Sequence, residues 1–337
     1  MPGLIHTTWR PGIVTNHGAK APSSPMPSDN SRKVVYVGLI VNVLIAVGKY
    51  VAAIISGSSS MLAEAFHSTA DSGNELLLLI GMKRSQRPPD SLHPYGHGKA
   101  LYFYCLLVAV YIFGVGGVLA VYEGISRFRH PRLPDHLLWN CAVLVIAECL
   151  ELYSWRVSYK ELVARKDPNE SLWDEIIGSK DPTVFIVFLE DSAGIIGALL
   201  ALTGIVLGHL LNNPYFDPIA SVAIGILLGA VAFLLGRETG ALLIGERTNR
   251  STMKKVQEVI NADKDVEQAG NLMTMQLGPN QVLLNVQIQF RRNLSLDQLE
   301  ATIDRIEKRI REVEPTIQRI FIEAESFTRK EPPSKAA

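Results

Sequence analysis

A polar stripe runs through an apolar stretch of the sequence, SMLAEAFHSTADSGNELLLLIG, at positions 60–81. The stripe repeats at intervals of three, four, three and one, which places its members on one helix face: Glu64, His67, Asp71, Asn74 and Glu75. His67 and Asp71 lie one turn apart and could hold a single cation between them. Each ionisable side chain costs about 2.5–3.5 kcal/mol at the centre of a membrane helix, and polar packing there usually employs uncharged side chains. The pattern favours function for His67 and Asp71, and packing or access for Glu64 and Glu75.

A later apolar run contains two further acids, Glu190 and Asp191. Adjacent positions point about 100° apart on a helix, so we do not expect both carboxylates at one site. Small residues follow, which let another helix approach closely: Gly194, Gly197, Ala198 and Ala201. The sequence shows no obvious lysine or arginine within the apolar runs to pair with these acids. Asp191, His67 and Asp71 form a nitrogen and oxygen donor set that suits Zn²⁺ and also Mn²⁺, Fe²⁺, Co²⁺ or Cd²⁺.

Glu148 and Glu151 form another pair of acids, three residues apart in an apolar run. Two interpretations remain open for them. They line a proton or ion path, to which Glu64, Glu75 and Glu190 also belong, or Glu151 lies near a membrane surface and pairs with Arg156.

A second group of metal-type ligands lies in the polar loop DSLHPYGHGK, at positions 90–99. Asp90, His93 and His97 provide one carboxylate and two imidazoles within eight residues. This combination is acceptable for a surface Zn²⁺ site.

The elements that must position these groups follow from hydropathy. Crossing a ~30 Å hydrocarbon core takes about 20 residues, and six segments qualify: 34–56, 59–82, 100–123, 136–156, 183–209 and 217–244. Lysines and arginines lie mainly on the side that would face the cytoplasm, which places both termini there. The formal net charge is zero, so nothing indicates nucleic acid as a partner. The 33 residues before the first segment are rich in Ser, Pro, Thr and Gly and are expected to be disordered.

The periodicity changes after residue 245. We expect a helix over 251–262, strands over 271–277 and 282–290, an amphipathic helix over 296–313 and a strand over 317–322. The order αββαβ predicts a small α+β domain of ferredoxin-like type after an all-α membrane domain. The predicted division is 1–33 disordered, 34–245 membrane domain, 246–328 cytoplasmic domain and 329–337 disordered tail.

These residues resemble the cation diffusion facilitator family, proton-coupled exporters of divalent metals, over roughly 34–325. The family's second helix carries His-x-x-x-Asp or Asp-x-x-x-Asp, which His67 and Asp71 match. Its loop Asp-x-x-His-Pro-x-Gly-His-Gly-Lys is matched from Asp90 to Lys99, and Asp217-Pro218 opens the sixth helix in the same way. The resemblance implies metal at both sites and a C-terminal domain that dimerises and senses metal.

Two departures from the family pattern concern metal choice. Val187 stands where most zinc members have a fifth-helix histidine before the aspartate, here Asp191. The fourth ligand is then water, Glu190 or a backbone group, which keeps Mn²⁺, Fe²⁺ and Co²⁺ open. The C-terminal part holds neither histidine nor cysteine, so only Glu323 and Glu325 stand as weak metal candidates there.

The resulting expectation is a homodimeric antiporter that exports Zn²⁺ in exchange for protons, with the metal as substrate and no cofactor. The alternatives are a Mn²⁺, Fe²⁺ or Co²⁺ exporter, or a membrane-anchored, metal-responsive regulatory protein without transport. No nucleophile–base pair or nucleotide loop points to an enzyme. The plasma (inner) membrane is the expected location, with an organelle membrane as the alternative.

Overall fold

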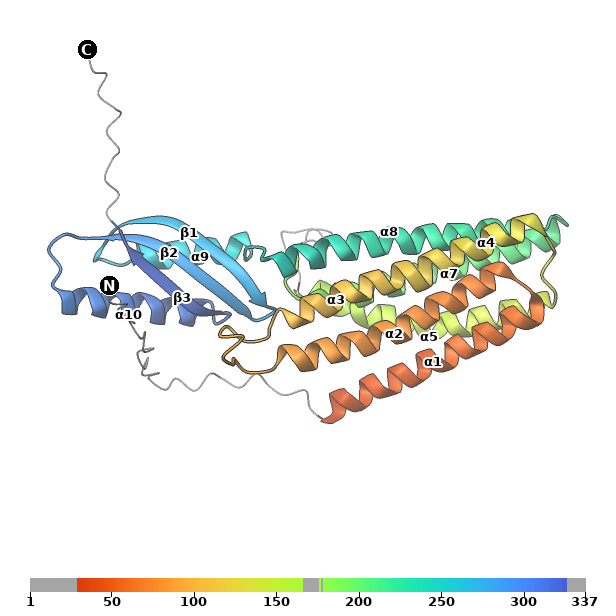
Figure 1. Ribbon diagram of the computed structural model, residues 1–337, viewed down its shortest axis with the longest axis horizontal. Coiled ribbons are helices and arrows are strands. Elements are labelled where there is room, and N and C mark those ends of the chain that lie inside the picture. Colours follow the sequence, from red (N-terminus) through yellow and green to blue (C-terminus); the bar gives the residue numbers. More distant parts are fainter. Residues whose placement is uncertain (1–28, 166–175, 177, 326–337) are drawn as a thin grey trace, which may run out of the picture. The chain divides into compact units, whose positions relative to one another are not determined.

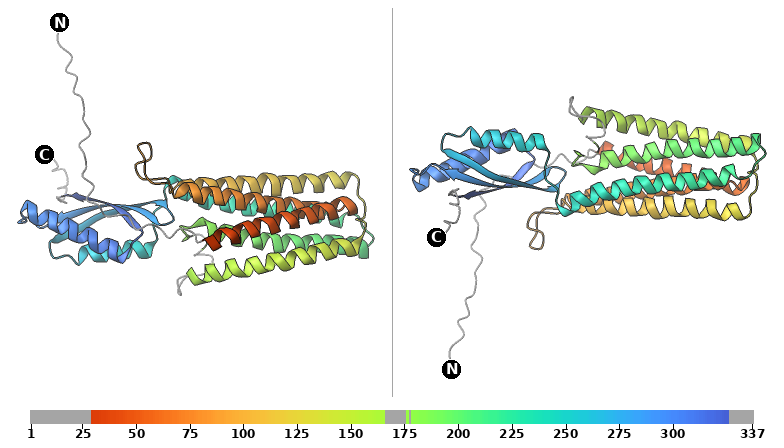
Figure 2. Two further views of the ribbon diagram at one scale, coloured as in Figure 1. Left: turned by 90° about the horizontal axis from the view of Figure 1, so that it is seen from below. Right: turned by 90° about the horizontal axis from the view of Figure 1, so that it is seen from above.

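The computed structural model describes residues 29–165, 176 and 178–325 (Figure 1). The chain divides into two units, 1–38 and 39–337, and nearly all described elements belong to the second. Long helices run side by side (Figures 1 and 2): α1 (Asp29–Ser56), α2 (Ser59–Ser85), α3 (Ala100–Tyr111) continued by α4 (Leu119–Arg129), α5 (Leu137–Arg165), α7 (Pro182–Leu210) and α8 (Phe216–Ile244). Their order and approximate bounds agree with the sequence. The predicted tail at 329–337 and the first 28 residues lie outside the described part.

Among the residues that the structure describes, four helical stretches are long and apolar enough to cross a membrane by length and composition. They are Ala100–Arg129, Leu137–Lys160, Phe185–Leu210 and Phe216–Ile244. In α1 the described apolar stretch is shorter, Asn42–Ser56, and α2 is absent from the set despite its 27 residues. The polar stripe on α2 explains why hydropathy ranks this helix low. The first helix, α1, begins at Asp29, within the segment up to residue 33 that the sequence analysis expects to be disordered.

The third long helix changes its winding halfway. A π-helical segment, η1 (Ile112–Val118), joins α3 to α4. Glycines then bring η1 and α4 against α8: a Cβ on Gly124 of α4 would lie 2.9 Å from the carbonyl oxygen of Pro218, and one on Gly117 of η1 would lie 3.2 Å from that of Gly225. Such close backbone approach requires small residues and is typical of packed membrane helices.

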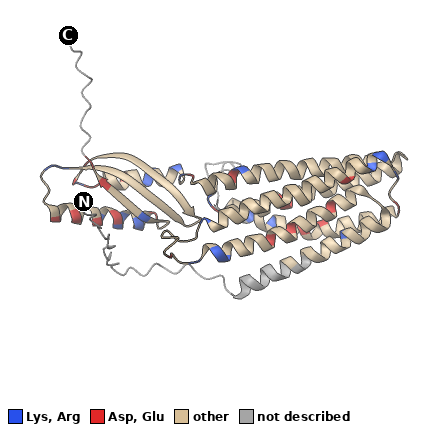
Figure 3. Ribbon diagram, in the orientation of Figure 1, with Lys and Arg blue, Asp and Glu red and all other residues tan. Residues whose placement is uncertain are grey.

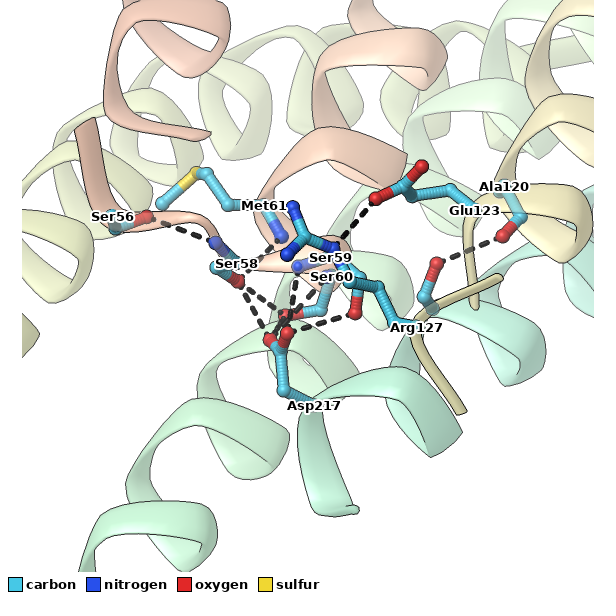
Figure 4. A network of polar contacts seen from close by, with 10 residues as sticks. Ser56, Ser58, Ser59, Ser60, Met61, Ala120, Glu123, Arg127 and Asp217 are labelled. Carbon is cyan, nitrogen blue, oxygen red and sulfur yellow. Dashed lines mark hydrogen bonds and ion pairs between the residues drawn. The ribbon is translucent and has the colours of Figure 1, made fainter. Parts of the chain in front are cut away.

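The start of α2 is held by a carboxylate from α8 (Figure 4). Asp217 accepts hydrogen bonds from the Ser58 hydroxyl at 2.6 Å, the Ser59 backbone N–H at 2.6 Å and the Ser59 hydroxyl at 2.8 Å. The Ser60 hydroxyl donates to it as well. Asp217 is 2% exposed, so its charge is stabilised by the orphan N–H groups and positive dipole end of the helix. This bond network fixes the helix that carries His67 and Asp71.

The C-terminal elements form a small α+β domain in the predicted order: α9 (Arg250–Asn261), β1 (Val266–Gly278), β2 (Gln281–Phe290), α10 (Leu296–Val313) and β3 (Ile317–Ala324) (Figure 1). The strand order is β1-β2-β3, antiparallel for the first pair and parallel for the second. Alternate residues of β2 are buried with Val256, Ile306 and Ile310 of the helices. Ser295 caps α10 in a reciprocal capping box with Gln298, as its first turn predicts.

The first strand is longer than predicted, since it begins at Val266 and not at residue 271. Its pairing with β2 shifts register between Val266 and Gln268 and again between Ala269 and Leu272. These irregularities interrupt the alternation of apolar and polar residues. For this reason the sequence pattern did not predict the first part of the strand.

Candidate metal centre

The polar stripe of α2 faces the interior of the helical domain. Glu64 and Asn74 are 0% exposed and His67 is 2% exposed. The His67 Nδ1 atom lies 3.5 Å from Asp71 Oδ1, across one helical turn. Neither atom has a hydrogen-bond partner among the described residues, although both are buried. Buried polar atoms normally have such partners, so this pair is the strongest structural indication of a binding site in the helices.

A buried lysine on α1 contradicts the expectation that no cation is available inside the apolar helices. Lys49 is 0% exposed, and its Nζ lies 2.9 Å from Glu64 Oε2 and 3.1 Å from Glu151 Oε1. Glu151 therefore pairs with Lys49, and not with Arg156 as one interpretation proposed. The signal was present in the sequence, because Lys49 is the one charged residue between Val34 and Ser56. Figure 3 shows that charged positions recur along the helices and are not confined to their ends.

The two adjacent acids of α7 point to different neighbours, as their helical spacing requires. Glu190 is 8% exposed and accepts a hydrogen bond of 2.6 Å from the Asn74 amide on α2. Asp191 accepts hydrogen bonds from Ser154 at 3.0 Å and Ser158 at 3.3 Å, both on α5. Asp191 is thus oriented by α5, while Glu190 faces the polar stripe of α2. The predicted set His67, Asp71 and Asp191 is not gathered into a closed cluster of ligand atoms in the described chain.

Two glycines of α7 make room for the buried polar groups. A Cβ on Gly194 would lie 2.6 Å from Glu151 Oε2 and 2.9 Å from His67 Nε2. A Cβ on Gly197 would lie 2.5 Å from Glu64 Oε1. The sequence suggested Gly194 and Gly197 as points of helix contact. They also leave room for the His67 imidazole and for the carboxylates of the two glutamates.

Two further acids of the expected proton or ion path, Glu75 and Glu148, lie in different surroundings. Glu75 accepts a hydrogen bond of 2.9 Å from the Asn42 amide on α1. Glu148 lines an apolar groove of about 190 Å³ between α5 and α7, together with Leu144, Cys149 and Leu199. The groove is lined by apolar atoms, which suits contact with lipid better than passage of an ion.

The loop ligands come together in the structure. Asp90 Oδ1 lies 3.1 Å from His93 Nδ1, and Asp90 Oδ2 lies 3.0 Å from His97 Nε2. Their ligand atoms all lie within 4.8 Å of one another, the one such trio of His, Cys, Asp or Glu within the described ranges. Gly96 adopts φ of 87°, a left-handed turn that brings the second histidine back towards the first. Hydrogen bonds from the His93 backbone N–H and the His97 ring lower the pKa of Asp90 to about 2, so its carboxylate stays ionised and ready to bind a cation.

The C-terminal candidates have ordinary surroundings. Glu323 accepts long hydrogen bonds of 3.4 Å from Asn285 and Gln287 on the neighbouring strand. Both Glu323 and Glu325 are exposed and belong to no ligand cluster of the described residues. A solvated strand edge accounts for them.

Comparison with known proteins adds two family matches. Residues 35–244 match the cation efflux transmembrane domain, and 249–327 match the cation efflux protein cytoplasmic domain. The chain is 32% identical over 260 residues to the mouse protein "Proton-coupled zinc antiporter SLC30A9, mitochondrial", covering 77% of this chain and 46% of that protein. It therefore spans about half the length of this relative.

Two further relatives cover more of their own length. "Metal tolerance protein C4" of Arabidopsis thaliana is 27% identical over 344 residues, which is 90% of this chain and 75% of the relative. "Manganese efflux system protein MneP" of Bacillus subtilis is 23% identical over 276 residues, which is 80% and 86%. The names of these relatives include both zinc and manganese.

Proposed function

Because the chain belongs to the cation efflux family, we propose that it is an integral membrane antiporter that exports divalent metal ions, Zn²⁺ foremost, in exchange for protons. The observation that carries the proposal is the buried His67–Asp71 pair, whose facing atoms are 3.5 Å apart and have no hydrogen-bond partner among the described residues. A protein used only as an anchor gains nothing from such a pair. The relative named as a zinc antiporter supports the choice of Zn²⁺ and protons, and MneP keeps Mn²⁺ as the alternative.

The proposed cycle is alternating access. In the inward-facing state a divalent ion binds neutral His67 and ionised Asp71, with Asp191 turning from its serine partners to join them. Two carboxylates balance the charge of the ion inside the membrane. When the helices open the site outward, protons replace the metal, because ligands must be deprotonated to bind it.

The proposed arrangement has six spans over 34–245, with both termini in the cytoplasm. Residues 246–328 form a cytoplasmic domain through which two copies pair. The loop trio Asp90, His93 and His97 is proposed as a peripheral metal site. The plasma membrane is the proposed location, and the word mitochondrial in the name of one relative supports an organelle membrane as the alternative.

The test is metal uptake into proteoliposomes under an imposed pH gradient. Zn²⁺, Mn²⁺, Co²⁺, Fe²⁺ and Cd²⁺ are compared for the unchanged chain, for Asp71→Ala and for Asp304→Asn, which alters an exposed acid of α10. We expect gradient-driven uptake that Asp71→Ala reduces to background and Asp304→Asn leaves intact. Absence of uptake for every metal would contradict the proposal and favour a regulatory protein.

A further inference from the structure

Asp191 of α7 lies at the height of the polar stripe of α2. Just before it, Glu190 accepts a hydrogen bond of 2.6 Å from the Asn74 amide. Just after it, a Cβ on Gly194 would lie 2.9 Å from His67 Nε2. These two contacts bracket the part of α2 that carries its metal-type aspartate, four residues after the histidine. The two aspartates are therefore level with each other along the neighbouring helices.

The Asp191 carboxylate is nevertheless held by a third helix. Its Oδ2 atom accepts a hydrogen bond of 3.0 Å from the Ser154 hydroxyl of α5. The Ser158 hydroxyl lies 3.3 Å from the same oxygen, and it divides its single proton between this oxygen and the carbonyl of Trp155, which is 3.0 Å away. The two serines are four residues apart, so one face of α5 presents both hydroxyls to one carboxylate. Ser154 makes the shorter of the two bonds.

Aromatic contacts join α5 to α7 beside these serines. The indole N–H of Trp155 donates to the Ser192 hydroxyl at 2.9 Å. The rings of Trp155 and Tyr159 stack with their centroids 5.2 Å apart, and they lie 6.0 and 6.2 Å from the ring of Phe188. These separations are favourable for aromatic rings. The packing therefore keeps the serine face of α5 in register with Asp191.

This placement leaves the pair on α2 without a third ligand. His67 Nδ1 and Asp71 Oδ1 are 3.5 Å apart, and neither has a hydrogen-bond partner in the described part of the chain. Asp191 lies at the right height to join them, but its carboxylate oxygen is occupied by the serine hydroxyls. A cation that takes Asp191 as a ligand must compete with these hydrogen bonds.

We propose that Ser154 and Ser158 are positioning residues that hold Asp191 away from the His67–Asp71 pair until metal displaces them. This inference rests on the proposed function, because it concerns a ligand of the same site. The hydroxyls satisfy the carboxylate when no metal is bound, so part of the binding free energy of the metal is used to break their bonds. The serines therefore lower the affinity for metal, which favours its release during transport.

The experiment measures Co²⁺ binding to the purified full chain in detergent by its visible absorption. The background carries Asp90→Asn, His93→Ala and His97→Ala, so that the loop trio does not contribute. In this background Ser154→Ala/Ser158→Ala should tighten Co²⁺ binding about three- to tenfold, the usual net contribution of one hydrogen bond. Ser154→Thr keeps the hydroxyl and should bind as the background does. Damage to the fold would weaken binding, so the direction of the change separates positioning from a structural defect.

Further variants isolate the part played by Asp191. In the same background, Asp191→Ala should weaken Co²⁺ binding about tenfold or more, because a ligand is lost. When Asp191→Ala is present, the two serine substitutions should leave the affinity unchanged, since no carboxylate remains for the hydroxyls to hold. The control is Thr203→Val, which removes a hydroxyl that donates to the Leu199 carbonyl of its own helix. It should bind Co²⁺ as the background does.

The results that overturn the inference differ from failure of the proposed function. Unchanged or weaker binding by the double serine variant would overturn it while leaving metal export by the His67–Asp71 pair in place. Ser154 is exposed, so Ser154→Ala alone gives the same test if the double variant fails to fold. Equal tightening in the presence of Asp191→Ala would also overturn the inference, because the serines would then act on another group. Absence of Co²⁺ binding in the background would overturn the membrane site and both proposals with it.

Discussion

The two groups of metal-type ligands in this protein use the same chemistry in opposite surroundings. Asp90, His93 and His97 lie within eight residues of one loop, with Asp90 and His93 about half exposed, and local hydrogen bonds suffice to hold them. The group around His67 is buried, is drawn from several helices and includes Lys49 as a countercharge. Water stabilises the charges of the loop, whereas charges within the helices depend on one another. The loss of stability on removing one partner should therefore be larger where the partners are more deeply buried.

The largest effect is expected where burial is complete. Lys49→Met leaves Glu64 and Glu151 in an apolar environment without their cation, and breaking a buried ion pair in this way costs about 3–5 kcal/mol. Thermal unfolding of the purified chain in detergent should show a large loss of stability. The double variant Lys49→Met/Glu64→Gln should recover part of it, because one stranded charge is removed. If Lys49→Met were as stable as the unchanged chain, burial would not determine how much stability is lost with one partner.

A somewhat smaller effect is expected at the start of α2. Asp217→Ala removes the acceptor of several serine donors (Figure 4), and leaving buried donors without a charged acceptor should cost about 3 kcal/mol. The matched control is Asn213→Ala, which removes the acceptor for one backbone N–H, that of Tyr215, in the preceding loop. Thermal unfolding of both variants gives the difference. Equal losses of stability in the two variants would mean that the contribution of the Asp217 network does not depend on its burial.

These buried contacts also mark the limit of prediction from sequence. Helical period and hydropathy predicted the long helices and placed His67 and Asp71 on one face, because both depend on local spacing. The partners of Glu151 could not be predicted, since Lys49 lies 102 positions away and meets it only after the helices pack. The two candidates of α7 show the same limit: their spacing excluded a shared site, but only packing shows that Glu190 meets Asn74 and that Asp191 meets Ser154.

An intermediate effect is expected in the C-terminal domain, where one partner is buried and the other is not. Arg305 donates two hydrogen bonds of 2.8 Å to Asp263, whose side chain is 2% exposed while that of Arg305 is 34% exposed. Arg305→Met should cost about 1.5–3 kcal/mol, the usual range for a hydrogen bond to a charged group. Hydrogen exchange of α9, α10 and β2 in the full chain measures this loss, with Arg309→Met as the control at the longer distance of 3.9 Å.

The same pair predicts a pH dependence with a definite sign. The hydrogen bonds from Arg305 lower the pKa of Asp263 below that of the unfolded chain. The stabilisation is therefore complete above the unfolded value, about pH 4, and is lost as the pH falls through the lower folded value. Protection of the domain, corrected for intrinsic exchange rates, should converge between Arg305→Met and the unchanged chain below about pH 4. A constant difference down to pH 2 would contradict this account.

The smallest effect on stability is expected in the loop. Asp90→Asn removes an exposed carboxylate whose pKa of about 2 reflects hydrogen bonds from the His93 backbone and the His97 ring. Because water replaces these bonds readily, thermal unfolding should stay within the scatter of repeat measurements. Metal binding should nevertheless suffer, since a ligand is lost from a trio that is already assembled. Equilibrium dialysis with Co²⁺ should show one site fewer than in the unchanged chain.

If Asp90→Asn instead destabilised the protein as much as Lys49→Met is expected to do, burial would not be what separates the two groups. If it left the number of bound ions unchanged, the assembled geometry of the loop would not by itself make a metal site, and the chemistry would belong to the helices alone.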